Sequence, residues 1–163
     1  MCQIRLACLI IPLLHPAAVS AQDRPGPPAA ALYAGLGHAF GGLGVRGEGH
    51  LLSGRLSALA GVGMLIGGEV ENLEWAASLR GYAGSPNHRV FLDLSWTWLA
   101  GGTLAFPGSP SYTIYGAGLS VGYTYIADSG LTLTSGAGIG LPQDHREFLF
   151  QIGVGWTWRR SNR

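Results

Sequence analysis

The sequence is poor in charged residues, contains no lysine and has no cysteine beyond its eighth residue. Charged residues make up 12% of its 163 residues, and all ten basic residues are arginine. A soluble domain usually carries about 25% charged residues, so this composition argues against an ordinary water-soluble globule. Nine acids nearly balance the arginines, which leaves no basic excess for binding nucleic acid. An apolar content of 47% argues equally against a disordered chain.

The first 21 residues predict a cleaved secretory signal peptide. Arg5 precedes an apolar run at 6–14, and Val19-Ser20-Ala21 has the small residues of a cleavage site. The run is too short for a spanning helix, which needs about 20 apolar residues. Because Arg5 stands where a lipoprotein signal needs an apolar residue, Cys8 is not interpreted as a lipidation site.

Both cysteines, Cys2 and Cys8, lie inside this predicted signal. The mature chain therefore excludes a disulfide scaffold, a thiolate metal site and a cysteine nucleophile. It would also be neutral, because the loss of Arg5 leaves nine arginines against nine acids.

Beyond the signal, no apolar run reaches about 18 residues without glycine or a polar residue, so no transmembrane helix is predicted. Apolar residues instead alternate with small or polar residues, which indicates β-strands. The clearest strand is the last. Every second residue from Phe148 to Trp158 is apolar, and the residues between them include Gln151, Thr157 and glycines. Eight such segments are expected, at 30–40, 43–51, 55–66, 74–84, 89–102, 112–126, 131–140 and 147–159. The first is the least regular, because His38 falls on its apolar face.

The two faces of these strands differ in a way that predicts the class of protein. One face carries nearly all the tryptophans, and the other is mostly glycine, serine and threonine. Since there are too few charges to solvate an outer wall, the apolar face is expected to meet lipid, where only a closed sheet satisfies its backbone. We therefore predict an all-β fold, an eight-stranded antiparallel up-and-down transmembrane β-barrel over 30–159. A lead-in at 22–29 and a tail at 160–163 complete the chain.

Aromatic residues near the strand ends predict the belts that flank a membrane barrel. This girdle comprises Trp75, Trp96, Trp98, Tyr115, Tyr123, Tyr125, Trp156 and Trp158. Short turns are expected on the periplasmic side at 52–54, 85–88 and 127–130. Longer connections are expected outside at 67–72, 101–111 and 142–146, with a very short one at Gly41-Gly42.

The chain resembles small outer-membrane β-barrels of the OmpA/OmpX-like superfamily over about 30–159. Its last strand, QIGVGWTW, is similar to their assembly signal, polar-x-Gly-x-x-apolar-x-apolar, with Gln151, Gly153, Trp156 and Trp158 in the four defining places. The resemblance implies a porin-like membrane protein of a Gram-negative outer membrane, in contact with lipid and lipopolysaccharide. It also implies insertion by the barrel-assembly machinery. Family members often end on the aromatic residue, whereas RRSNR follows here.

The inward face is expected to bring polar side chains together in the lumen. Eight strands enclose a space just wide enough to be filled by side chains, sometimes with one small ligand. The predicted set is Arg46, Glu48, His50, Arg80, Tyr82, Asp93, Thr97 and Gln151, with Arg159 as a further candidate. Because unpaired buried charges cost several kcal/mol each, we expect a plug of salt bridges and hydrogen bonds. The inward glycines leave a second interpretation open, a narrow water-filled cavity.

No catalytic, metal or cofactor site is predicted. Similar eight-stranded barrels modify lipid A, but no histidine here precedes a serine by two residues, as in the deacylase type. The Asp128-Ser129 pair, of the kind that the palmitoyl-transferase type uses, falls in a periplasmic turn. His145, with Asp144 and Glu147, is interpreted as part of a solvated loop rather than a metal site. Glycine-rich runs lack the following helix of a phosphate-binding loop.

The sequence thus predicts a monomeric, non-catalytic outer-membrane protein with a structural or surface-interaction role. Two alternatives remain from other classes. One is an outer-membrane enzyme that modifies lipid A, and the other is a soluble exported barrel that carries a lipid.

Overall fold

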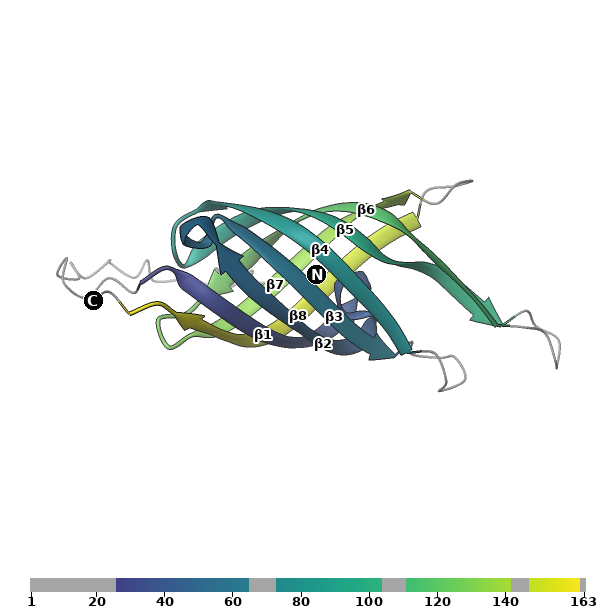
Figure 1. Ribbon diagram of the computed structural model, residues 1–163, viewed down its shortest axis with the longest axis horizontal. Coiled ribbons are helices and arrows are strands. Elements are labelled where there is room, and N and C mark those ends of the chain that lie inside the picture. The colour runs from purple at the N-terminus through teal and green to yellow at the C-terminus, as the bar shows by residue number, and fades with distance from the viewer. Residues whose placement is uncertain (1–25, 65–72, 104–110, 142–146, 162–163) are drawn as a thin grey trace, which may run out of the picture.

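Eight alternating segments of the sequence form eight strands that close into one antiparallel barrel (Figure 1). The computed structural model describes residues 26–64, 73–103, 111–141 and 147–161. The strands are β1 Pro28–Gly37, β2 Gly42–Leu51, β3 Leu56–Met64, β4 Leu73–Gly84, β5 His88–Thr103, β6 Ser111–Ile126, β7 Leu131–Leu141 and β8 Glu147–Arg159. Each strand pairs with its neighbours in sequence, and β8 pairs with β1. The predicted eight-stranded, up-and-down, all-β barrel is confirmed.

The two ends of the barrel carry different connections. At the end where β1 begins and β8 ends, here called the terminal end, the strands are joined by the short segments predicted at 52–54, 85–88 and 127–130. The first is a short 3-10 helix, η3 (Leu52–Gly54). The opposite end of the barrel is here called the loop end. There β5 reaches Thr103 and β6 starts at Ser111, so the connection between them is shorter than the predicted 101–111.

Several predictions concern residues that the structure does not describe. The signal peptide at 1–21 and the connections at 67–72 and 142–146 lie outside the described residues. Within the described part of the chain, no helix is long and apolar enough to cross a membrane.

The first strand departs from its prediction at both ends. β1 begins at Pro28, inside the predicted lead-in at 22–29, and ends at Gly37 instead of residue 40. His38–Phe40 instead form a 3-10 helix, η2, whose three residues are all buried. Gly37 and Gly41 flank η2 with φ of 116° and 66°, values that favour glycine. The alternation fails at His38 because the chain leaves the barrel wall and folds into the lumen.

Phe40 of η2 packs into a socket made of glycines from four strands. A Cβ atom on Gly35 or on Gly153 would lie 2.5 Å from Phe40 Cζ. A Cβ atom on Gly44 or on Gly63 would lie 2.4 Å from the Phe40 carbonyl oxygen. A larger residue would displace the Phe40 ring at Gly35 or Gly153 and the η2 backbone at Gly44 or Gly63, so the glycines make room for η2.

Other inward glycines make room for large side chains from nearby strands in the same way. The pairs are Phe91 with Gly122 and Gly136, Leu99 with Gly116 and Gly140, and Leu149 with Gly118. Phe91, Leu99 and Leu149 are at most 5% exposed. At these positions large side chains occupy the space beside the glycines, which leaves no water-filled cavity.

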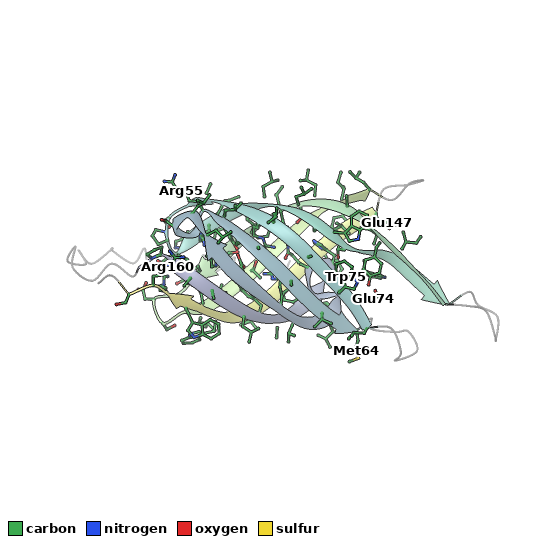
Figure 2. The ribbon with its side chains drawn as sticks, in the orientation of Figure 1. Arg55, Met64, Glu74, Trp75, Glu147 and Arg160 are labelled. Carbon is green, nitrogen blue, oxygen red and sulfur yellow. The ribbon has the colours of Figure 1, made fainter. Side chains whose placement is uncertain are left out.

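The outer face of the described strands is apolar. Its exposed side chains include Leu32, Val45, Val62, Leu79, Leu94, Val121, Leu133 and Ile152. No Asp, Glu or Arg side chain is exposed on the outer face of a described strand. Exposed Arg55 and Arg160 instead lie beyond the strands at the terminal end, as Figure 2 shows.

Candidate functional site: the polar lumen

Four strands supply a layer of polar side chains at the centre of the barrel. Arg46 of β2, Arg80 of β4, Asp93 of β5 and Gln151 of β8 are each at most 2% exposed. Each occupies an inward position of an alternating strand, so the pleat alone directs its side chain into the lumen.

Arg80 and Asp93 form a buried ion pair between directly opposed residues of β4 and β5. Arg80 Nη2 and Nε donate to Asp93 Oδ2 over 2.5 and 3.1 Å. The guanidinium carbon also lies 3.8 Å from the centre of the Phe91 ring, a favourable cation–π distance. The pair is therefore both charge-compensated and packed.

Gln151 joins the two central arginines. Its Oε1 accepts hydrogen bonds from Arg46 Nη1 at 2.6 Å and from Arg80 Nη2 at 3.0 Å. The Arg46 guanidinium carbon lies between two rings, 4.6 Å from the centre of Tyr33 and 4.7 Å from that of Phe40. One amide thus links β2, β4 and β8 across the lumen.

A second group of contacts, centred on Glu48, lies closer to the terminal end. Glu48 Oε1 accepts hydrogen bonds from Ser57 Oγ and from the Tyr82 hydroxyl, both at 2.6 Å. His50 Nε2 lies 3.7 Å from the same oxygen. These contacts tie β2 to β3 and β4.

No family model, curated protein or solved structure matches this chain. The interpretation of the lumen therefore rests on its own geometry.

The structure places the predicted lumen residues inside the barrel. Arg46, Glu48, His50, Arg80, Asp93, Thr97 and Gln151 are buried, and Tyr82 is partly exposed. Thr97 does not join the charged layer, because its Oγ1 donates to the His38 carbonyl oxygen of η2 at 2.7 Å. Arg159, the further candidate, lies at the terminal rim, where its Nη2 donates to Asn87 Oδ1 at 3.4 Å.

The lumen residues that the predicted set omits include Tyr33, Phe40, Phe91 and Arg89. Phe91 and Arg89 stand two and four residues before inward Asp93, so a longer count of the alternation would have found them. Tyr33 lay in the least regular predicted strand. Phe40 carried no usable signal, since it left the sheet.

The four residues of the assembly motif divide between the two faces of β8. Trp156 and Trp158 point outward near the terminal end, whereas Gln151 and Gly153 point inward. Inside, Gln151 bridges the arginines and Gly153 seats Phe40. The inward half of the motif therefore has a packing role in the folded barrel.

The predicted girdle separates into two rows. Trp75, Trp96, Trp98 and Tyr115 lie toward the loop end, and Tyr123, Tyr125, Trp156 and Trp158 lie toward the terminal end. In the first row, Trp75 stacks on Tyr115 with 5.2 Å between ring centres, and the Tyr115 hydroxyl donates to Glu74. Figure 2 shows Trp75 and Glu74 together at that end.

Of the residues weighed for catalysis or metal binding, the structure describes Asp128, Ser129 and Glu147. Asp128 Oδ1 accepts from Asn87 Nδ2 at 2.7 Å, and Ser129 Oγ accepts from the Leu131 amide at 3.4 Å. His145 and Asp144 lie outside the described residues. Among the residues that the structure describes, no group of three or more His, Cys, Asp or Glu side chains is placed to hold a metal ion.

Proposed function

We propose that this protein is an integral outer-membrane β-barrel with a closed lumen and a structural or surface-interaction role, without catalysis. The apolar outer face is the observation that carries the proposal. Exposed Leu, Val, Ile, Phe and Trp side chains surround the described strands, and no charged Asp, Glu or Arg is exposed among them. Water would solvate such a surface poorly, whereas a hydrocarbon layer matches it.

The two aromatic rows support the same placement. Trp and Tyr side chains prefer the two interfaces of a bilayer, and the girdle residues lie in one row toward each end of the barrel. The short turns of the terminal end suit the periplasm, which leaves the loop end for the outer leaflet and lipopolysaccharide. Because β8 carries the assembly motif, we also propose that the barrel-assembly machinery inserts the protein.

The filled lumen favours a closed barrel and argues against a channel or a soluble lipid carrier. Phe40, Leu99 and Leu149 pack toward the loop end, and the Arg80–Asp93 pair lies across the centre. A carrier of this size would need an apolar cavity inside the strands. In the centre of the barrel, side chains occupy that space.

Membrane insertion is testable by fractionation and heat-modifiable migration. We expect the mature protein in the outer-membrane pellet, with different mobilities on a denaturing gel before and after boiling. Recovery in the soluble periplasmic fraction, with no mobility shift, would contradict the proposal.

A pair of arginine substitutions tests the membrane depth of the outer face. Leu94, 60% exposed near the middle of β5, is expected to lie near the bilayer midplane. Leu94→Arg should therefore lower the free energy of unfolding by about 2–4 kcal/mol in lipid vesicles. Leu73, 70% exposed at the start of β4, is the matched control near the interface. Leu73→Arg should cost only about 0–1 kcal/mol, and equal costs at both sites would refute this placement.

A further inference from the structure

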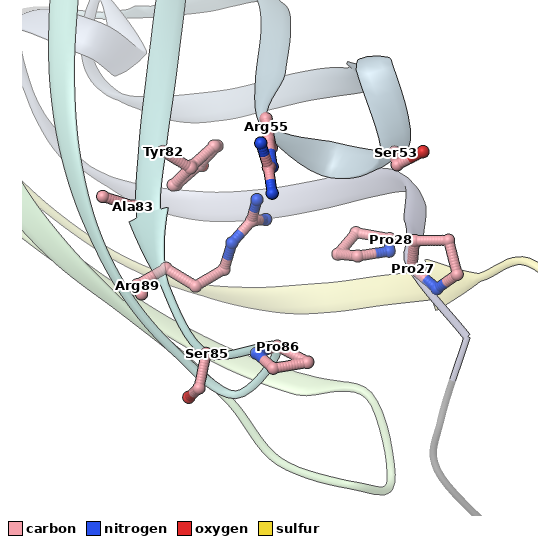
Figure 3. Close-up of a pocket in the computed structure, with 10 residues that line it drawn as sticks. Pro27, Pro28, Ser53, Arg55, Tyr82, Ala83, Ser85, Pro86 and Arg89 are labelled. Atoms are coloured by element: carbon pink, nitrogen blue, oxygen red, sulfur yellow. The ribbon is translucent and has the colours of Figure 1, made fainter.

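The terminal end of the barrel contains a pocket of about 550 Å³ with two arginines in its lining (Figure 3). Arg55 comes from the junction of η3 and β3, and Arg89 is the second residue of β5. Tyr82 and Ser85 of the β4–β5 hairpin line it on one side, and Pro28 at the start of β1 lines it on another. The lining contains no acidic residue.

Arg89 is held in the pocket by packing. It is 6% exposed, and its guanidinium carbon lies 3.8 Å from the centre of the Tyr82 ring. A Cβ atom on Gly54 would lie 3.5 Å from Arg89 Nη2 and 3.1 Å from Pro28 Cδ, so this glycine keeps the space beside the guanidinium open. The charge is thus preorganised on the wall of the pocket.

Arg55 is positioned by its backbone, while its side chain is exposed. Its amide donates to the Leu52 carbonyl oxygen at 3.1 Å, and its carbonyl oxygen accepts from the Tyr82 amide at 2.8 Å. Tyr82 thus contacts both arginines, since its amide bonds the Arg55 backbone and its ring packs on the Arg89 guanidinium.

The positive charge of the pocket has no direct partner in the described part of the chain. Neither Arg55 nor Arg89 forms an ion pair there, and Arg89 Nη1 is buried without a hydrogen-bond partner. Glu48, the acid of the neighbouring lumen cluster, already accepts from Ser57 and Tyr82. A nearly buried guanidinium that packs on a ring but has no paired carboxylate and one unsatisfied donor is unfavourable, so an anion in the pocket would relieve it.

We propose that this pocket binds a phosphate monoester through Arg55 and Arg89. Guanidinium groups match the oxygens of phosphate in a two-pronged geometry. Two permanently charged arginines also balance the charge of a phosphate monoester, about −1.5 to −2 at pH 7, better than the single charge of a carboxylate. The ligand is either a free phosphate monoester or the headgroup of a lipid, since both present the same group.

Titration with inorganic phosphate tests the site on the full mature barrel. The protein is folded in a phosphate-free detergent such as octyl glucoside, and binding is followed by calorimetry. We expect one saturable site, and Arg89→Gln and Arg55→Gln should each weaken binding at least about tenfold, because each removes one charge-assisted donor group. Arg55 is exposed, so its variant should fold normally, which the boiled and unboiled gel verifies for each protein.

Arg160→Gln is the matched control. Arg160 lies at the same end of the barrel but outside the pocket lining, where its Nη2 reaches the His50 carbonyl oxygen at 3.5 Å. This variant should bind phosphate within about twofold of the wild type, as distant rim charges are screened by salt. Equal weakening by all three substitutions would show diffuse attraction to the rim and overturn the proposal. Absence of saturable binding to the folded wild type would overturn it as well.

Two further probes distinguish the sources of the phosphate. Glycerol phosphate and dihexanoyl phosphatidic acid carry the same phosphate monoester, without and with acyl chains. Tighter binding of the second, still dependent on Arg89, assigns the pocket to a lipid headgroup, and equal binding assigns it to a soluble phosphate monoester. The inference goes beyond the proposed function, because a protein that fails to bind phosphate and still shows the gel shift remains a membrane barrel.

Discussion

The two halves of the lumen are filled by opposite kinds of contact. Toward the loop end, Phe40, Leu99 and Leu149 pack against glycines of the wall. From the centre to the terminal end, the Arg80–Asp93 pair and the hydrogen bonds of Gln151 and Glu48 dominate. Inward strand positions supply these side chains in both halves, apart from Phe40, which η2 carries into the lumen, so the halves differ in which side chains fill them.

This difference predicts how each half responds to change. Apolar contacts are non-directional, so the loop half should lose stability in proportion to the volume removed. Ion pairs and hydrogen bonds are directional, and a buried charge that loses its partner keeps its full desolvation cost. The central layer should therefore be the less tolerant of the two.

The largest effect is expected from Asp93→Ala, which leaves Arg80 without its carboxylate in the centre of the barrel. Breaking a buried pair from one side should lower the free energy of unfolding by about 3–5 kcal/mol. Urea titration of the protein folded in lipid vesicles measures this loss. The double variant Arg80→Met with Asp93→Leu should recover most of it, because two apolar residues leave no unpaired charge. A single-variant loss below about 1 kcal/mol would show that the central layer is well solvated.

Phe40→Ala should have the next largest effect. It empties the glycine socket of η2 and should cost about 3 kcal/mol, the low end of the range for this change, because the short η2 segment can relax into the space. The same urea titration applies. Phe40→Leu is the control, and it should retain more than half of the lost stability because it keeps most of the packed volume. If Phe40→Ala exceeded Asp93→Ala in cost, the ranking of the two halves would be reversed.

The smallest effect comes from adding a single methyl group to the wall. Gly153→Ala would place a Cβ atom 2.5 Å from Phe40 Cζ and should cost about 1–3 kcal/mol through overpacking. Gly49→Ala on the outer face of β2 is the control, since a Cβ atom there would have no neighbour within 4 Å. It should change stability by no more than about 0.5 kcal/mol.

A double variant sharpens this last test. Gly153→Ala combined with Phe40→Ala should cost less than the sum of the two, because the methyl group then enters the space that the ring has left. Strict additivity would mean that Phe40 does not occupy the socket beside Gly153.

The inward and outward faces of the barrel wall could largely be predicted from the sequence. The alternation from Phe148 to Trp158 fixed the two faces of β8, and Leu92, Asp93 and Leu94 fixed those of β5 in the same way. Side chains on a strand alternate regardless of what surrounds them, so a period of two is readable without the fold. The even count of strands and the short turns then pointed to an up-and-down barrel.

The contents of the lumen were less predictable. The sequence suggested that Arg46, Arg80 and Asp93 share an interior, but only the register of β4 on β5 sets Arg80 opposite Asp93. Arg46 lies instead between Tyr33 and Phe40, and reaches Arg80 only through Gln151. Such partners are distant in sequence and are selected by barrel closure, which no local pattern encodes.

The sequence by itself determined that this chain alternates, is apolar on one face and small or polar on the other, and has eight strands. The tertiary structure alone decided that η2 turns into the lumen, that glycines become sockets for large side chains, and that Arg55 and Arg89 share a pocket at the terminal end. The physical reason is the distance along the chain over which each feature is determined. Alternation is a local consequence of backbone geometry, whereas the filling of an enclosed space depends on every strand that encloses it.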